Sequence, residues 1–260
     1  MDISYKIGEG TYGKIALENN QDIENQIRTC GWYDTESTYL ALKIILELRK
    51  YNGNIHILDL GSEPGYYSIP FSRYTDGNIH TFIDEPEMLS LLKRSLQLNH
   101  IHNVKIYDKS VILSELPENG VLSFVRLDPG SETFLPFFQE HFEELNKCRP
   151  VIFLAGKNFS RGDKFLNFCL DHLADLDYRF TLYSHFAILF PSEYFWHFYP
   201  FLQGATDIKI KTALRFSKSS FSYQKLFNNP YIQKASGIKK QYYSLRWKYK
   251  LLSFQEEETE

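Results

Sequence analysis

Apolar and polar residues alternate along the first part of the chain with two different periods. Over residues 24–50 the apolar positions recur at helical spacing, which places them on one face: Leu40, Ile44, Ile45 and Leu48. Ile55, Ile57 and Leu58 then form a short apolar stretch that is typical of a buried strand. A glycine-containing turn follows, and a helical pattern resumes over residues 66–74. This part of the chain therefore predicts a helix, a strand, a turn and a second helix.

The alternation of strands and helices continues to about residue 190. The predicted strands are residues 78–86, 103–108, 121–128 and 150–156, with one or two more within 178–190. The predicted helices are residues 87–99, 131–147 and 163–176. Strands that alternate with helices predict an α/β fold with a doubly wound, mostly parallel sheet. In such a sheet, ligands bind outside the carboxyl ends of the strands, near the switch in strand order.

The pattern fades past Pro191, and three regions are predicted. Residues 1–50 hold an N-terminal strand-and-turn segment with a helix, residues 51–200 hold the α/β domain, and residues 201–260 form a C-terminal extension. A chain of 260 residues is long enough for one large domain with such an extension. Because the chain contains 21 Phe and 18 Tyr, we expect a core rich in aromatic side chains.

Composition argues against several kinds of site. The three cysteines, Cys30, Cys148 and Cys169, are widely spaced and form no C-x-x-C pair, so neither a disulfide framework nor a zinc site is predicted. The histidines are dispersed, which argues against any metal site. The N-terminus shows no apolar signal segment, and no uncharged apolar run of about 18 residues occurs. We therefore expect a soluble, cytoplasmic protein.

Charge is strongly segregated along the chain, although the net charge is only −3. Residues 208–254 contain eleven Lys or Arg and no Asp or Glu, whereas the last six residues contain four Glu. Such a basic segment usually marks a surface for an anionic partner. Its interleaved Tyr and Trp side chains suit RNA or an anionic membrane surface, which would make the protein membrane-peripheral. A solvated basic helix that packs through its aromatic residues is the third interpretation.

The stretch "KIGEGTYGKI" places Gly8, Gly10 and Gly13 at the G-x-G-x-x-G spacing of a protein-kinase phosphate loop. A kinase also needs an Asp base and an Asp that binds magnesium, but neither a His-Arg-Asp nor an Asp-Phe-Gly triplet occurs in the chain. We therefore interpret the three glycines as turn residues of the N-terminal segment. The residues from Tyr12 to Trp32 are candidates to cover the edge of a ligand site.

Acidic residues stand at equivalent places after three of the predicted strands, namely Asp59, Glu85 and Asp128. Gly61 and Gly65 lie in the turn after the first of these strands, where glycine lets a ligand approach the backbone. An acidic residue after the next strand, about 20 residues on, can accept hydrogen bonds from both hydroxyls of a ribose. This arrangement suits a nucleotide-like cofactor, and the lack of a Walker lysine argues against a P-loop ATPase.

Four segments in this region resemble a known family. "ILDLGSEPGYYSIPFS" resembles the first motif of class I S-adenosylmethionine (SAM) methyltransferases, and it is most similar to the FkbM-type group. "FIDEP", "LLKRSLQLNHIHNVKIYDKSV" and "VRLDPGSETFLPFFQEHFEELNKCRPVIFLAG" resemble the following motifs of that group, in the same order. The matches span about residues 30–190. The resemblance implies a Rossmann-like fold, SAM as cofactor and methyl transfer as the activity.

Carried over position by position, the resemblance also implies roles. The residues implied to shape the pocket for the methionine part of SAM are Asp59, Gly61, Ser62, Gly65 and Tyr66. Glu85 is implied to bind the ribose hydroxyls, and Asp128 to lie near both the sulfonium and the acceptor. The chain departs from the family at Glu63, where an Asn is usual, and at "DPGSE", which lacks the middle Glu of the family motif.

The resemblance therefore implies a SAM-dependent methyltransferase that acts on a hydroxyl of a sugar, a glycan or a related small molecule. Asp128 is the candidate to orient the acceptor or take its proton, and Lys157 is a candidate to face the same crevice. One alternative is an RNA 2′-O-methyltransferase that uses Lys43, Asp128, Lys157 and Glu193. Another is a methyltransferase-fold protein that binds its partner without catalysis.

Overall fold

The computed structural model describes residues 5–18, 21–61, 63–83, 85–107, 122–128, 134–155, 172–173, 176–182, 186–194, 197–198 and 206–209. Its helices are α1 (Gln21–Cys30), α2 (Thr35–Asn52), α3 (Ser68–Tyr74), α4 (Pro86–Leu98), α5 (Phe134–Glu140) and α6 (Phe142–Cys148). A hairpin is formed by β1 (Lys6–Gly10) and β2 (Gly13–Leu17). The strands of the main sheet are β3 (His56–Leu60), β4 (Ile79–Phe82), β5 (Val104–Tyr107), β6 (Leu122–Leu127), β7 (Val151–Ala155), β8 (Tyr178–Leu182), β9 (Phe186–Pro191) and β10 (Thr206–Lys209).

The main sheet has the strand order β10-β8-β9-β7-β6-β3-β4-β5. The five strands from β7 to β5 are parallel, β9 runs antiparallel between β7 and β8, and β10 pairs antiparallel with the outer edge of β8. Strands β3, β6 and β7 are buried along their whole length, as expected when helices cover both faces of a parallel sheet. The prediction of a doubly wound, mostly parallel α/β sheet is confirmed.

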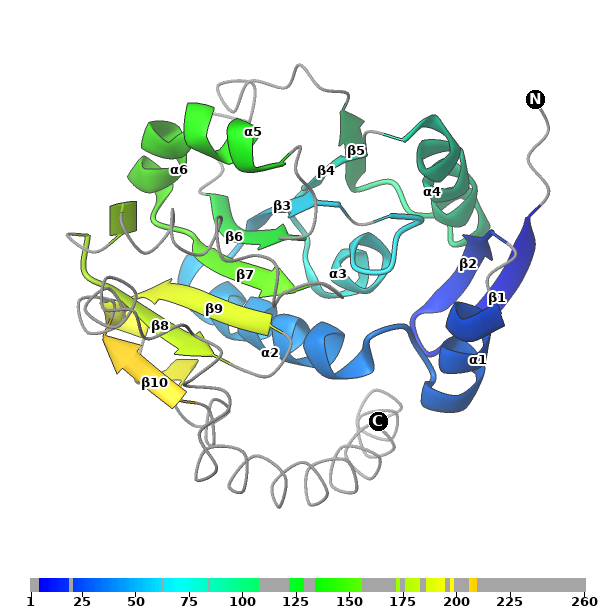
Figure 1. Cartoon of the computed structure of the whole chain (residues 1–260), viewed down its shortest axis with the longest axis horizontal. Helices are drawn as coiled ribbons and strands as arrows, with labels where there is room; N and C mark the ends of the chain where they lie inside the picture. Colours follow the sequence, from blue (N-terminus) through cyan, green and yellow to red (C-terminus); the bar gives the residue numbers. More distant parts are fainter. Residues whose placement is uncertain are drawn as a thin grey trace, which may run out of the picture.

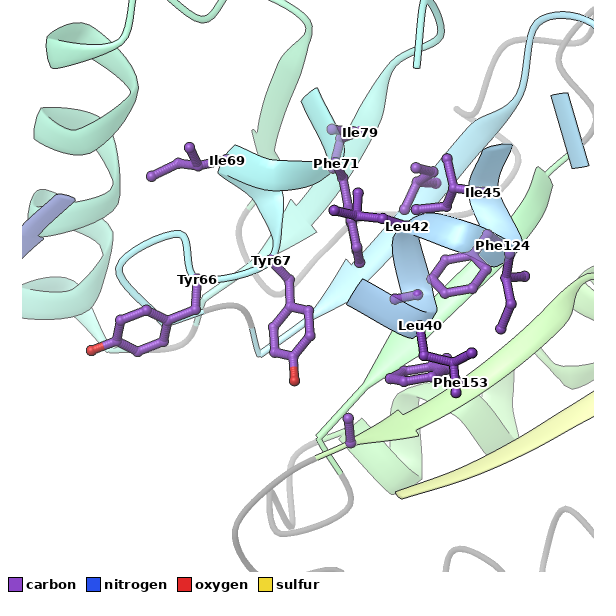
Figure 2. Close-up of a cluster of buried hydrophobic side chains, with 14 of the residues drawn as sticks. Leu40, Leu42, Ile45, Tyr66, Tyr67, Ile69, Phe71, Ile79, Phe124 and Phe153 are labelled. Carbon is purple, nitrogen blue, oxygen red and sulfur yellow. The ribbon is translucent and has the colours of Figure 1, made fainter. Parts of the chain in front are cut away.

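Helices lie on both faces of the sheet, with α2 on one side and α5 and α6 on the other (Figure 1). The core between α2, α3 and the sheet is rich in aromatic rings, as the composition predicted. Phe71 of α3 packs edge-on against Phe124 of β6, and Phe124 packs against Phe153 of β7. Figure 2 shows this cluster, with the rings of Tyr66 and Tyr67 beside it and their hydroxyls pointing away. Tyr66 and Tyr67 belong to the turn between β3 and α3, so this turn lies directly beside the core.

The glycine-rich N-terminal stretch forms the β1–β2 hairpin, so a strand-and-turn segment is confirmed. The three glycines are not its turn residues, since Gly8 and Gly10 lie in β1, Gly13 begins β2, and the turn is residues 11–12. The hairpin packs on α4, where Asn99 and Ser95 hydrogen-bond the backbone of β2. Gly10 allows the backbone of the hairpin to approach Gly31 closely, since a Cβ at Gly10 would lie 2.2 Å from the carbonyl oxygen of Gly31. Close packing against Gly31 therefore explains the glycine at position 10, which belongs to the G-x-G-x-x-G spacing.

Two predicted helices are each divided in two. The helix expected over residues 24–50 is α1 and α2, separated by a turn in which Gly31 and Asp34 have positive φ angles of 81° and 44°. The carbonyl of Gly31 accepts a hydrogen bond from the backbone N–H of Thr11, so a tertiary contact holds this break. The helix expected over residues 131–147 is α5 and α6. The helix expected over residues 163–176 lies outside the described residues, apart from residues 172, 173 and 176.

The predicted C-terminal extension contributes a strand to the sheet, because β10 begins at Thr206. Residues 210–254 of the basic segment lie outside the described residues. In the part of the chain that the structure describes, no helix is both long and apolar enough to cross a membrane. The division into three regions stays a prediction, although the hairpin, α1, α2 and the sheet all contribute side chains to one hydrophobic cluster.

Candidate functional site

The strand order reverses between β3 and β6, which are neighbours in the sheet. From β3 the chain passes to β4 on one side, and from β6 it passes to β7 on the other. Such a switch point leaves a crevice outside the carboxyl ends of the two strands, where open α/β sheets bind their ligands. The backbone N–H of Asp128 donates to the carbonyl of Leu60 over 3.2 Å, so the ends of β6 and β3 are joined there.

The glycine turn predicted to hold a cofactor leaves β3 at this point and enters α3. Gly61, Glu63 and Gly65 all have positive φ angles, of 84°, 47° and 112°. Glycine adopts this conformation without steric cost, which explains two of the three positions. A Cβ at Gly65 would also come within 3.1 Å of side-chain carbons of Ile69 and Leu92. The turn is therefore packed tightly between α3 and α4, and the predicted strand–turn–helix arrangement is present.

Asp59 lies inside β3 rather than after it, and its side chain is fully buried. Ser68 of α3 donates a hydrogen bond of 2.6 Å to one carboxylate oxygen of Asp59. The other carboxylate oxygen lies 3.5 Å from Nη1 of Arg126 in the neighbouring strand β6. A contact between Asp59 and a cofactor stays a prediction, and the contacts of its carboxylate give it a role in holding the turn against the sheet.

Arg126 is the residue of this site that sequence analysis missed. Its guanidinium is buried, and it donates hydrogen bonds of 3.1 Å to the carbonyls of Leu60 and Ala155. The guanidinium also lies over the ring of Tyr67, 4.1 Å from its centroid. Burial alone would lower the pKa of Arg126, but the negative charge of Asp59 and its other neighbours outweighs it, so the pKa is raised. The signal in the sequence was one charged residue within the apolar run of β6.

The segment between α1 and α2 approaches the turn from the other side. The indole N–H of Trp32 donates to the carbonyl of Tyr66 over 2.7 Å, and the hydroxyl of Tyr67 donates to Asp34 over 2.7 Å. The ring of Tyr33 packs on the ring of Tyr66 with 4.3 Å between centroids. Burial, followed by the charge of Glu63, raises the pKa of the Tyr33 hydroxyl.

The residues from Tyr12 to Trp32 are predicted to cover the edge of a ligand site, but the two side chains at the ends of this segment lie in the core. Tyr12 and Trp32 are both buried and pack edge-on against each other in the core. Tyr33, one residue beyond the predicted range, is only half-buried and lies against the turn. The turn is therefore contacted by Trp32, the last residue of the predicted segment, and by Tyr33, which follows it directly.

The other predicted site residues are distributed as follows. Glu85 is exposed at the carboxyl end of β4, directly before α4, and its side chain makes no capping hydrogen bond. The backbone N–H of Gly61 donates to the carbonyl of Phe82 over 3.4 Å, which joins the turn to the same end of β4. Asp128 is half-buried at the end of β6. Ser62 and Lys157 lie outside the described residues.

The set Lys43, Asp128, Lys157 and Glu193 does not form one cluster. Glu193 follows β9 and makes a bidentate ion pair with Arg149, with N–O distances of 3.2 and 2.9 Å. Arg149 stands just before the first residue of β7. Because β9 is antiparallel to β7, Glu193 lies at the amino ends of the parallel strands, whereas Asp128 lies at their carboxyl ends. At about 3.3 Å per strand residue, roughly 20 Å separates them. The prediction of this catalytic set is wrong.

A second polar cluster lies within the sheet, away from the switch point. Nε2 of His80 lies 3.4 Å from Nδ1 of His56, and Nδ1 of His80 lies 3.0 Å from the hydroxyl of Tyr107. Burial, with a contribution from the neighbouring His56, lowers the pKa of His80 to about 4. Among the described residues, no group of three His, Cys, Asp or Glu side chains could hold a metal ion.

No protein-family model matches the chain, and no curated protein matches it. Among solved structures, the O-methyltransferase TomG from Streptomyces achromogenes, in complex with SAM, is 16% identical, covers 66% of this chain and 96% of its own, and has a TM-score of 0.44. The precorrin-6y C5,15-methyltransferase from Geobacter metallireducens is 16% identical, with coverages of 59% and 85% and a TM-score of 0.44. An rRNA methylase from Streptococcus thermophilus is 11% identical, with coverages of 60% and 94% and a TM-score of 0.43.

Likenesses at this level say nothing about the cofactor or substrate of this chain. The fold class rests on the chain's own strand order and strand directions. The FkbM-type resemblance is seen only in the sequence motifs and stays a prediction.

Proposed function

We propose that the chain is a SAM-dependent methyltransferase that methylates a hydroxyl oxygen of a sugar, a glycan or a related small molecule. The observation that carries this proposal is the meeting of three elements at one switch point. The glycine turn, Asp128 and the end of β4 that precedes Glu85 are joined there by backbone hydrogen bonds. The FkbM-type motifs supply the family hypothesis and cover the same residues.

The chemistry of the side chains fits this cofactor. The exposed carboxylate of Glu85 can accept hydrogen bonds from both ribose hydroxyls. Asp128 and Glu63 add carboxylates near the turn, and carboxylates attract the positive sulfonium of SAM. The negative charge of Glu63, the residue that departs from the family motif, also contributes to the raised pKa of Arg126.

Bound SAM supplies a methyl group on a positively charged sulfur. The chain's own residues then have to place the acceptor oxygen in line with that methyl group, which is chiefly a matter of position. Asp128, half-buried at the end of β6, orients the acceptor hydroxyl and takes its proton in this proposal. Glu85 and the glycine turn hold the cofactor from the side of β3 and β4.

Calorimetry with SAM and S-adenosylhomocysteine (SAH) is the first test. The wild-type chain should bind both ligands, and Glu85→Gln should weaken binding by about 10-fold or more, because hydrogen bonds to a charged group contribute about 1.5–3 kcal/mol each. Glu87→Gln is the matched control, because Glu87 is also exposed and lies two residues further along, in the first turn of α4. Binding of neither ligand at millimolar concentration would reject the proposal and favour a non-catalytic binding module.

The anionic partner of residues 208–254 stays a separate prediction. The structure sharpens its test, because truncation after Lys209 removes ten of the eleven basic residues of this segment while it keeps β10. Loss of flotation with vesicles that contain anionic lipid would assign a membrane partner, and loss of salt-dependent RNA binding would assign RNA. A truncated chain that behaves like the full chain in both assays would contradict the prediction.

A further inference from the structure

We propose that Arg126 is a positioning residue that holds the glycine turn and Asp128 in register at the switch point. The inference deepens the proposed function and rests on it for its meaning in catalysis. Arg126 contributes no atom to the reaction. It acts through the backbone and side chains that its guanidinium contacts.

The first line of argument is the set of strand ends that meet on this side chain. Arg126 belongs to β6, and its two Nη atoms donate to the last carbonyls of the strands on either side, Leu60 of β3 and Ala155 of β7. The carbonyl of Leu60 also accepts from the backbone N–H of Asp128. One buried guanidinium therefore ties together the three strand ends from which the predicted site residues emerge.

The second line of argument is the contact with the turn itself. The guanidinium lies over the ring of Tyr67, the last residue before α3, and pairs with Asp59. Asp59 in turn accepts a hydrogen bond from Ser68, the first residue of α3. Both ends of the turn, at Leu60 and at Tyr67, thus contact Arg126. Displacement of this side chain would free the turn at both ends.

The shape of the guanidinium matters as well as its charge. Its planar fork can donate to two carbonyls that face each other across β6 while it stacks on an aromatic ring. A lysine at this position would keep the positive charge near Asp59, but its single ammonium cannot stack in the same way. Arg126→Lys should therefore retain part of the function, and Arg126→Met should lose more of it.

Hydrogen exchange tests the positioning role without any ligand. In Arg126→Met, the backbone amides of residues 61–67, apart from Pro64, and of Asp128 should exchange at least about 10-fold faster than in the wild type, with a smaller increase in Arg126→Lys. Arg149→Met is the matched control, because it removes an arginine at the opposite ends of the strands. Unchanged exchange at residues 61–67 in Arg126→Lys and Arg126→Met, or an increase spread evenly over all strands, would overturn the proposal. If Arg126→Met does not fold, the comparison of Arg126→Lys with the wild type decides.

Ligand binding separates this inference from the proposed function. If the wild type binds SAH, the dissociation constant should rise about 10-fold or more in Arg126→Met, less in Arg126→Lys and not at all in Arg149→Met. Equal affinity in the wild type and Arg126→Met would overturn the positioning role. A wild type that binds neither SAM nor SAH would reject the proposed function, while the exchange experiment would still confirm or overturn the structural role of Arg126.

Discussion

Exchanging Asp59 for Asn should destabilise the wild-type chain but should cost little, or even stabilise, a chain that already carries Arg126→Met. The two charged groups are 0% and 3% exposed and lie 3.5 Å apart. At an effective dielectric constant of about 20, charges at this distance attract by about 5 kcal/mol. Loss of one partner of a buried pair typically costs about 3–5 kcal/mol, since the other charge stays buried without compensation.

The asparagine replacement isolates the charge from the shape of the side chain. Asn keeps an oxygen that can accept the hydrogen bond from Ser68, so the contact with α3 survives. In the wild type, Asp59→Asn leaves the cation of Arg126 buried, whereas in the Arg126→Met chain it removes a buried anion. We therefore expect the effect of Asp59→Asn to change by about 3 kcal/mol or more between the two backgrounds.

Urea unfolding of the four proteins at pH 7, followed by circular dichroism, measures this difference. The slope of the free energy against urea concentration should be the same in all four, which would show that they unfold from equally compact states. A cost of Asp59→Asn that agrees within about 0.5 kcal/mol in both backgrounds would refute the reasoning. The pair would then contribute no coupling, and the buried charges would have to be stabilised independently.

Further substitutions test the packing and electrostatics around the site. Gly65→Ala should lower the free energy of unfolding by about 1–3 kcal/mol, because φ is 112° and the added methyl group meets two side chains at 3.1 Å. Trp32→Phe should cost about 1–3 kcal/mol, since the buried carbonyl of Tyr66 loses its indole donor. Glu193→Gln should cost no more than about 1 kcal/mol, because its ion pair is exposed, and should leave SAH affinity unchanged. His80 has a pKa of about 4 when folded and an ordinary value of 6.5, so stability should be full above pH 6.5 and fall by about 3 kcal/mol as the pH drops from 6.5 to 4.

Matched controls accompany these substitutions, all followed by urea unfolding. Gly53→Ala shares the positive φ but meets no atom within 4 Å, so a loss as large as that of Gly65→Ala would contradict the packing argument. His80→Gln should flatten the acid limb of the stability profile, whereas the exposed His102→Gln should leave it in place. An acid limb that is the same in both variants would exclude His80 as its cause. A clear loss of SAH affinity in Glu193→Gln would contradict the placement of Glu193 at the amino ends of the parallel strands, opposite to the candidate site.

The arrangement of strands and helices could be predicted from the sequence because each element carries its own periodicity. The buried runs of β3, β6 and β7 and the helical spacing of α4 identify these elements without knowledge of their neighbours. The breaks within the long predicted helices were not visible, because a contact with a distant part of the chain helps to set one of them. The turn between α1 and α2 is held by the hairpin, about twenty residues earlier, through Thr11 and Gly31.

Some features of the candidate site could likewise be predicted from the sequence, and others could not. The sequence by itself determined the glycine turn, and it placed Glu85 and Asp128 after their strands at the same end of the sheet, since parallel strands end on one side of a sheet. Only the tertiary structure decided that Asp59 is buried with Arg126, because that pairing depends on β3 and β6 being neighbours. It also separated Glu193 from Asp128, because the reversed direction of β9 carries Glu193 to the opposite edge. The strand order and the reversed direction of β9 arise from packing between distant segments, and the alternation of strands and helices along the chain does not specify them.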